Sequence, residues 1–141
     1  REAAATASIP GRMEVLRHDP ILMVDGAHNP QAMAVLAEAL RHEMPGMKWE
    51  MVFGTMADKE SGEMLESLRG LITRVHAVSA RTTRARSAVE VAQLAAQVLD
   101  VPVDTHVSTE AALDAIATTD HPVLVTGSIY VVGEARAHLT Q

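Results

Sequence analysis

Apolar residues along this chain alternate between two kinds of pattern. Continuous apolar runs, of which Ile21–Asp25 is the clearest, are typical of strands buried on both faces of a parallel sheet. From Pro30 onward the apolar residues recur at helical spacing, with Asn29 as a typical N-cap and Pro30 at the first helical position. The predicted strands are 13–17, Ile21–Asp25, Trp49–Phe53, 74–79, 101–107 and 122–127. The predicted helices are 30–44, 61–69, one that Ser87 and Glu90 begin as a capping box, one capped by Ser108 or Thr109, and a closing helix to about residue 139.

Strands that alternate with helices at this spacing predict parallel strands joined by right-handed crossovers. We therefore expect an α/β fold, a three-layer Rossmann-like domain. It would have a mostly parallel sheet of about six strands, one antiparallel edge strand and helices on both faces. Residues 9–11, Ile-Pro-Gly, indicate a turn or linker, so the domain is expected over 10–141, with 1–9 as a linker or the end of a preceding domain. Without an initiator Met or a signal-peptide pattern, the chain is expected to be a piece of a longer protein.

Composition narrows the classes of partner. The absence of cysteine excludes disulfides and thiolate metal sites, and it allows a reducing compartment, so the cytoplasm is the expected location. A net charge of −6 and only three aromatic residues, Trp49, Phe53 and Tyr130, argue against a nucleic-acid partner. The apolar runs are far shorter than the roughly twenty residues of a membrane helix, so no membrane partner is expected.

Polar and glycine-containing segments follow four predicted strands. In a parallel sheet these carboxyl ends meet at one edge, where ligands bind. The segments are 25–28 (Asp-Gly-Ala-His), 54–59 (Gly-Thr-Met-Ala-Asp-Lys), 79–81 (Ser-Ala-Arg) and 127–128 (Gly-Ser). Because such turns are polar in any α/β protein, composition alone leaves a ligand site and a plain set of turns about equally open.

Each candidate residue has two interpretations on its chemistry. Asp25 could accept hydrogen bonds from a ribose diol or cap the following helix, and His28 could act in catalysis or lie on the surface. Arg12 could hold a phosphate through its planar fork or be a solvated charge. The same choice between an anionic ligand and solvent applies to the basic cluster Arg81, Arg84 and Arg86.

Several catalytic signatures are missing from the sequence. It has no Gly-rich loop ending in Lys-Ser/Thr, no GxSxG elbow and no HExxH. Its seven histidines show no metal-ligand spacing, so no metal site is expected. The segment alone therefore has no evident catalytic centre.

Four ordered motifs nevertheless resemble one family. PGRME at 10–14, DGAHNP at 25–30, GTM followed by Asp-Lys within 54–59, and VTGSIY at 125–130 resemble the C-terminal domain of folylpolyglutamate synthase and bifunctional dihydrofolate synthase, of the Mur ligase superfamily. The resemblance covers nearly the whole chain. It implies a ligase that uses ATP to turn a carboxylate of dihydropteroate or folate into an acyl phosphate, which the glutamate amine then attacks.

The resemblance also implies roles for single residues. Arg12 would contact the phosphates of ATP, and Asp25 would contact the ribose. His28, the candidate catalytic residue, would contact the nucleotide or the incoming glutamate. Ser128 would contact the glutamate. The phosphate loop and Mg²⁺ would belong to an N-terminal ATPase domain of the same enzyme, so this chain would be inactive alone. We expect Arg12→Ala and Asp25→Ala to impair turnover with little loss of stability, as is usual for exposed turns.

Three alternatives stay open at this point. The chain could be the C-terminal domain of another Mur-type amino-acid ligase, because related acid-and-histidine turns occur there. It could be a non-catalytic nucleotide-binding α/β module, or a plain interaction domain whose polar turns carry no chemistry.

Overall fold

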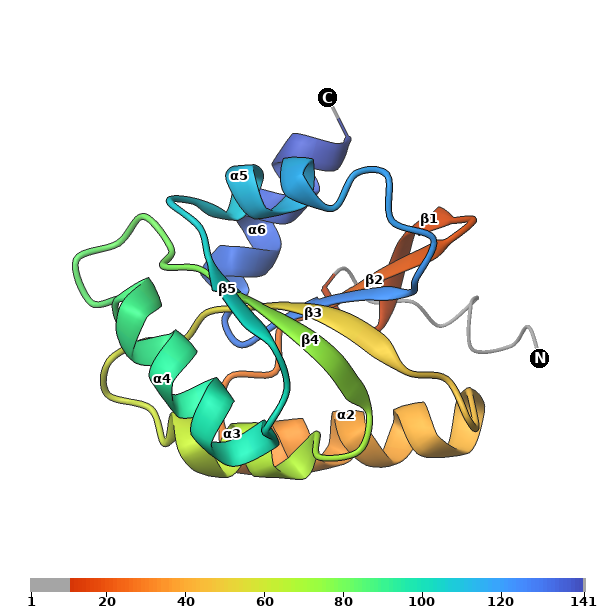
Figure 1. The fold of residues 1–141 in the computed structure, drawn as a ribbon, viewed down its shortest axis with the longest axis horizontal. Coiled ribbons are helices and arrows are strands. Elements are labelled where there is room, and N and C mark those ends of the chain that lie inside the picture. The colour runs from red at the N-terminus through yellow and green to blue at the C-terminus, as the bar shows by residue number, and fades with distance from the viewer. Residues whose placement is uncertain (1–10, 141) are drawn as a thin grey trace.

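The computed structural model describes residues 11–140, so the predicted linker at 1–9 and Pro10 lie outside the described residues. The described chain forms one six-stranded sheet between two layers of helices (Figure 1). The strand order is β1-β2-β6-β3-β4-β5, and only the β1–β2 pair is antiparallel. The predicted α/β fold, with one antiparallel edge strand, is confirmed. The elements are β1 (Glu14–His18), β2 (Ile21–Asp25), α2 (Pro30–Glu43), β3 (Trp49–Phe53), α3 (Ser61–Ser67), β4 (Ile72–Ala77), α4 (Ala88–Leu99), β5 (Val103–Thr105), α5 (Thr109–Ala115), β6 (Val123–Thr126) and α6 (Ile129–Leu139).

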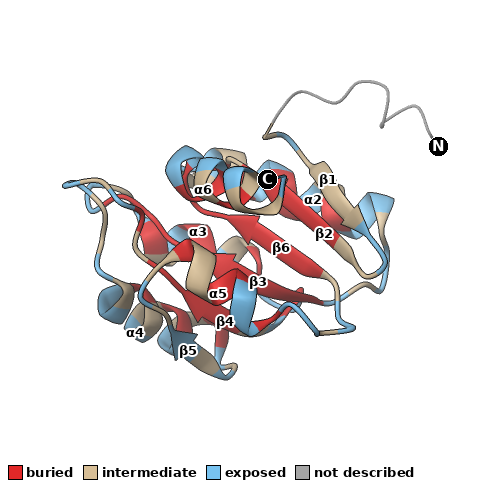
Figure 2. Cartoon of the chain, turned by 90° about the horizontal axis from the view of Figure 1, so that it is seen from above, coloured by how far each residue is buried: buried red, intermediate tan, exposed pale blue. Residues whose placement is uncertain are grey.

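The two faces of the sheet are covered by different helices. Helices α2, α3 and α4 lie on one face, and α5 and α6 lie on the other (Figure 1). Side chains alternate along each strand, so Met23 and Met51 enter the first core while Val24 and Val52 enter the second. The central strands β2, β3 and β6 are almost wholly buried, whereas the edge strands β1 and β5 are partly exposed (Figure 2). Burial on both faces explains why the central strands are continuous apolar runs.

Three of the predicted helix starts, those of α2, α4 and α5, are confirmed by side-chain caps. The Asn29 carboxamide oxygen accepts the Ala32 N–H at 2.8 Å at the start of α2. The Ser87 hydroxyl accepts the Glu90 N–H at 3.2 Å, and Ser108 rather than Thr109 caps α5. Each cap satisfies a backbone donor that the helix itself leaves without a partner.

Four predicted strands have different bounds in the structure. Strand β1 lies one residue later than predicted, and β6 is one residue shorter at each end. Strand β4 starts at Ile72 and ends at Ala77, two residues earlier at each end than predicted, because its parallel partner β3 ends opposite Ala77. Strand β5 has only three residues instead of seven, since Pro102 lacks an N–H and His106 already leaves the strand. Within residues 11–140, no helix combines the length and apolar character needed to cross a membrane.

Candidate functional site at the carboxyl ends of β2 and β6

The chain changes sides of the sheet between two adjacent parallel strands. Asp25 ends β2 directly opposite Thr126 at the end of β6. Strand β2 continues into α2 on one face, and β6 continues into α6 on the other. Ligands of open α/β sheets bind where successive connections diverge in this way. The N-termini of α2 and α6 both point to this place, so their partial positive charges favour an anion there.

Asp25 is buried at this edge and holds two backbone segments together. Only 5% of its surface is exposed. One carboxylate oxygen accepts the Ala27 N–H at 2.9 Å and the other accepts the Met13 N–H at 3.0 Å. Burial raises the pKa of Asp25 above its ordinary value, although these two hydrogen bonds and the charge of Arg12 oppose the rise. The expectation that Asp25 occupies an exposed turn is therefore wrong, because its carboxylate is part of the local framework.

Arg12 lies at the apex of the turn that Asp25 holds. Its neighbours Gly11 and Met13 both have positive φ angles, of 81° and 45°. The turn is attached to the end of β2 by a hydrogen bond of 2.7 Å from the Gly26 N–H to the Gly11 carbonyl. The Arg12 side chain is exposed, so its guanidinium can meet a ligand in the solvent beside the sheet edge.

His28 is exposed at the N-terminal approach to α2. Its Nδ1 lies 3.0 Å from the Gly26 carbonyl oxygen. A carbonyl oxygen only accepts, so this contact requires a proton on Nδ1 and leaves Nε2 of a neutral ring as the acceptor. His28 can therefore accept a proton or a hydrogen bond on the atom that faces away from the backbone.

Ser128 has a structural task that the sequence prediction did not include. Its hydroxyl oxygen accepts the Val131 N–H at 3.0 Å and caps α6, and the residue is only 1% exposed. The preceding Gly127 has a φ of +114°, and a Cβ there would overlap the Gly54 carbonyl. The ends of β6 and β3 thus approach more closely than any side chain at residue 127 would allow. The hydroxyl of Ser128 does not face the solvent, so the contact with glutamate stays a prediction.

Two members of the basic cluster bind acceptors of the protein itself. Arg86 donates to the carbonyls of Ala57 at 2.8 Å and Lys59 at 3.0 Å, and so fixes the turn after β3. Arg81 forms a two-pronged ion pair with Glu110 at 2.7 and 2.8 Å. The Arg84 side chain is exposed, unlike Arg86 it fixes no turn, and unlike Arg81 it is in no ion pair described here. These three arginines therefore do not converge on one anion site.

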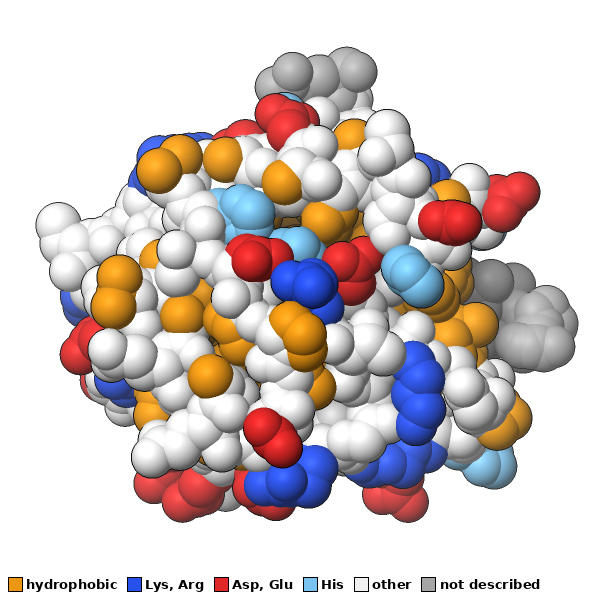
Figure 3. Space-filling view, in the orientation of Figure 1, with side chains coloured by type: hydrophobic (Ala, Val, Ile, Leu, Met, Phe, Trp, Pro, Cys, Tyr) orange, Lys and Arg blue, Asp and Glu red, His pale blue; other side chains and the backbone are white. Residues whose placement is uncertain are grey.

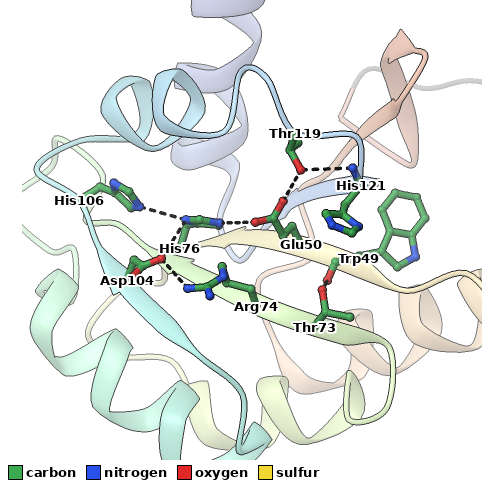
Figure 4. Close-up of polar contacts among 9 residues, drawn as sticks. All are labelled: Trp49, Glu50, Thr73, Arg74, His76, Asp104, His106, Thr119 and His121. Carbon is green, nitrogen blue, oxygen red and sulfur yellow. Dashed lines mark hydrogen bonds and ion pairs between the residues drawn. The ribbon is translucent and has the colours of Figure 1, made fainter.

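A second polar cluster, which sequence reasoning missed, lies on the face that carries α5 (Figure 4). His76 of β4 contacts the Glu50 carboxylate at 3.1 Å through Nε2 and His106 Nε2 at 3.0 Å through Nδ1. The Thr119 hydroxyl donates to the other Glu50 oxygen at 2.9 Å. The sequence did indicate this cluster in one way, because Glu50 and His76 are polar residues within predicted buried strands.

The cluster shifts two pKa values downward. Burial raises the pKa of Glu50, but the hydrogen bonds from His76 and Thr119 outweigh it and bring that pKa below its ordinary value. Burial, together with the charge of His76, lowers the pKa of His106. Figure 3 shows histidine, acidic and basic side chains around a hollow on this side of the molecule. In the described residues no group of three or more His, Cys, Asp or Glu side chains could hold a metal ion, and this cluster is no exception.

Comparison with known proteins identifies the family. Residues 11–129 match the family model described as Mur ligase, glutamate ligase domain. The chain belongs to this family. A probable bifunctional folylpolyglutamate synthase/dihydropteroate synthase of Haloferax volcanii is 37% identical over 135 residues, which are 94% of this chain and 16% of that protein. A dihydrofolate synthase/folylpolyglutamate synthase of Bacillus subtilis is 24% identical over 99% of this chain and 32% of its own length.

Solved structures show the same fold. The folylpolyglutamate synthase of Mycobacterium tuberculosis, complexed with ADP and AMPPCP, superposes with a TM-score of 0.85 at 26% identity, over 95% of this chain and 33% of that one. This glutamate ligase domain therefore spans one third or less of the relatives described here. The family predicted from the four motifs is confirmed.

In this glutamate ligase domain the motifs lie side by side. Hydrogen bonds join the turn at 11–13 to the segment at 25–27, and the contact between Gly127 and Gly54 joins the ends of β6 and β3. Segments far apart in sequence thus form one edge, as the hydrogen bond from the Thr126 hydroxyl to the Asp25 carbonyl, across 101 positions, illustrates. The sequence motifs therefore mark one place in three dimensions.

Proposed function

We propose that this chain is the C-terminal domain of an ATP-dependent ligase that adds L-glutamate to dihydropteroate or folate through an acyl phosphate. The observation that carries the proposal is the pair of exposed, chemically competent side chains, Arg12 and His28, at the point where β2 and β6 diverge. Family membership and relatives named as folylpolyglutamate and dihydrofolate synthases support the substrate class.

In this proposal Arg12 binds the phosphates of ATP. Its guanidinium is planar and permanently charged, and it projects from a turn whose backbone is bonded on both sides. A fixed cation of this kind stabilises the negative charge that develops during phosphoryl transfer. Asp25 holds the turn, and the lone pairs that its two hydrogen bonds leave unused can accept from a ribose hydroxyl.

His28 would serve the second step, in which the glutamate amine attacks the acyl phosphate. An ammonium group must lose a proton before it can attack, and Nε2 of His28 is an acceptor as long as Nδ1 donates to the Gly26 carbonyl. Ser128 is buried, so its part on the glutamate side would be to hold the start of α6 through its cap. The remaining partners would be an N-terminal ATPase domain of the same cytoplasmic enzyme, with Mg²⁺ bound by that domain.

The test uses the full-length polypeptide that contains this chain. We expect ATP consumption only when dihydropteroate or folate and glutamate are both present. Arg12→Ala should reduce kcat/KM for ATP at least tenfold, and Arg69→Ala, which removes an exposed arginine beside the C-terminal end of α3, should leave it unchanged. Turnover with a muramyl substrate instead would overturn the folate assignment, and equal activity of the Arg12 variant and the wild type would overturn the role of the site.

A further inference from the structure

A carboxylate just after the Arg12 turn forms contacts that the proposed function does not use. One oxygen of Glu14 accepts the Gly11 N–H at 2.9 Å. The same carboxylate binds the Arg136 guanidinium through two hydrogen bonds, of 3.2 Å from Nε and 2.8 Å from Nη2. Glu14 begins β1 and Arg136 belongs to α6, so this contact closes a loop of 122 residues.

The contacts of Glu14 complete a frame around Arg12. The Gly11 N–H is held by Glu14, the Gly11 carbonyl by the Gly26 N–H, and the Met13 N–H by Asp25. Left-handed backbone at a residue with a side chain, here Met13, is unfavourable by about 1–2 kcal/mol, so the turn needs such bonds to persist. Without Glu14, the N–H of Gly11, the residue before Arg12, would lose its acceptor.

The pair with Arg136 fixes the Glu14 carboxylate in turn. Two parallel N–H···O bonds to an arginine restrict a carboxylate more than a single contact does. The side chains are partly buried, with 20% of Glu14 and 36% of Arg136 exposed, which limits screening by solvent. The anchor lies on α6, the helix whose N-terminus carries Ser128, so both sides of the proposed site share one rigid support.

We propose that Glu14, held by Arg136, is a positioning residue that sets the Arg12 turn for nucleotide binding. Neither residue needs to touch ATP. The proposal rests on the proposed function, because it requires Arg12 to contact the nucleotide.

A double-mutant cycle in the full-length ligase tests this proposal. Glu14→Ala should raise KM for ATP at least about tenfold, as expected for loss of a hydrogen bond to a charged group, and leave KM for glutamate unchanged. Arg136→Ala should raise KM for ATP by a smaller factor. In the Arg12→Ala background neither change should raise it further, because the positioned group is already gone.

Matched variants separate positioning from general destabilisation. Glu14→Gln retains an oxygen for the Gly11 N–H but loses one of the two bonds from Arg136, so it should raise KM for ATP by about as much as Arg136→Ala and by less than Glu14→Ala. Glu66→Ala breaks another two-pronged pair, with Arg69 beside α3, and should not change KM for ATP. Additive effects of Glu14→Ala and Arg12→Ala, or a Glu14→Gln variant as impaired as Glu14→Ala, would overturn the proposal. An unchanged KM for ATP in Arg12→Ala alone would instead refute the role of Arg12 in the proposed function, on which this proposal rests.

Discussion

Replacing Asp25 by alanine should destabilise the fold, in contrast to the expectation from sequence. The substitution leaves two backbone donors, the N–H groups of Ala27 and Met13, without their acceptor. Each hydrogen bond to a charged acceptor contributes about 1.5–3 kcal/mol. The raised pKa shows that burying the charge already costs part of this gain, so the net loss should be about 2 kcal/mol.

Urea unfolding of the 141-residue chain measures this loss. With an m value of about 2 kcal/mol per molar for a domain of this size, the midpoint of Asp25→Ala should fall by about 1 M. Asp25→Asn retains one acceptor and removes the buried charge, so it should remain within about 1 kcal/mol of the wild type. Arg12→Ala, at an exposed position, should change stability by less than about 0.5 kcal/mol.

Two results would refute the reasoning about Asp25. A midpoint of Asp25→Ala within about 0.2 M of the wild type would mean that its hydrogen bonds contribute nothing net. Equal destabilisation by Arg12→Ala would mean that the turn is stabilised through the arginine rather than through the carboxylate.

Three further outcomes follow from the same structure. Gly127→Ala should lower stability by about 3 kcal/mol or more, because its Cβ would overlap the Gly54 carbonyl, whereas Gly133→Ala, at an open helical position, should raise the thermal midpoint slightly. Ser128→Ala should cost about 1 kcal/mol in urea unfolding through loss of the α6 cap. Below about pH 6.5 the unfolded chain binds a proton at His106 more readily than the folded one, and the same holds for Glu50 near its ordinary pKa of 4.5. The free energy of unfolding therefore falls as pH falls through the range of each group. Between pH 7 and 5.5 the urea midpoint should fall less in His106→Asn than in the wild type.

Local patterns predicted the elements of this fold well, because each depends on neighbouring residues. The caps at Asn29 and Ser87 are contacts over three positions, and the apolar runs of β2 and β3 follow from burial on both faces. The ends of β4 could not be predicted, since they are set by where β3 stops.

The long-range part of the site was beyond sequence reasoning from one chain. The motifs named Arg12, Asp25, His28 and Ser128, but nothing local indicates that Asp25 would bind the Met13 N–H. Contacts such as Glu14 with Arg136 join residues whose separation carries no periodic signal. Family resemblance predicted which residues matter, and only the folded structure distinguishes exposed groups from framework groups.

The position of β6 has a consequence for synthesis of the chain. β6 lies between β2 and β3, although it comes after all the other strands that the structure describes. During translation, therefore, the facing edges of β2 and β3 stay unpaired until residues 123–126 have left the ribosome. Completion of the sheet is then a late event, and a nascent chain stalled before residue 123 would present two apolar strand edges to chaperones.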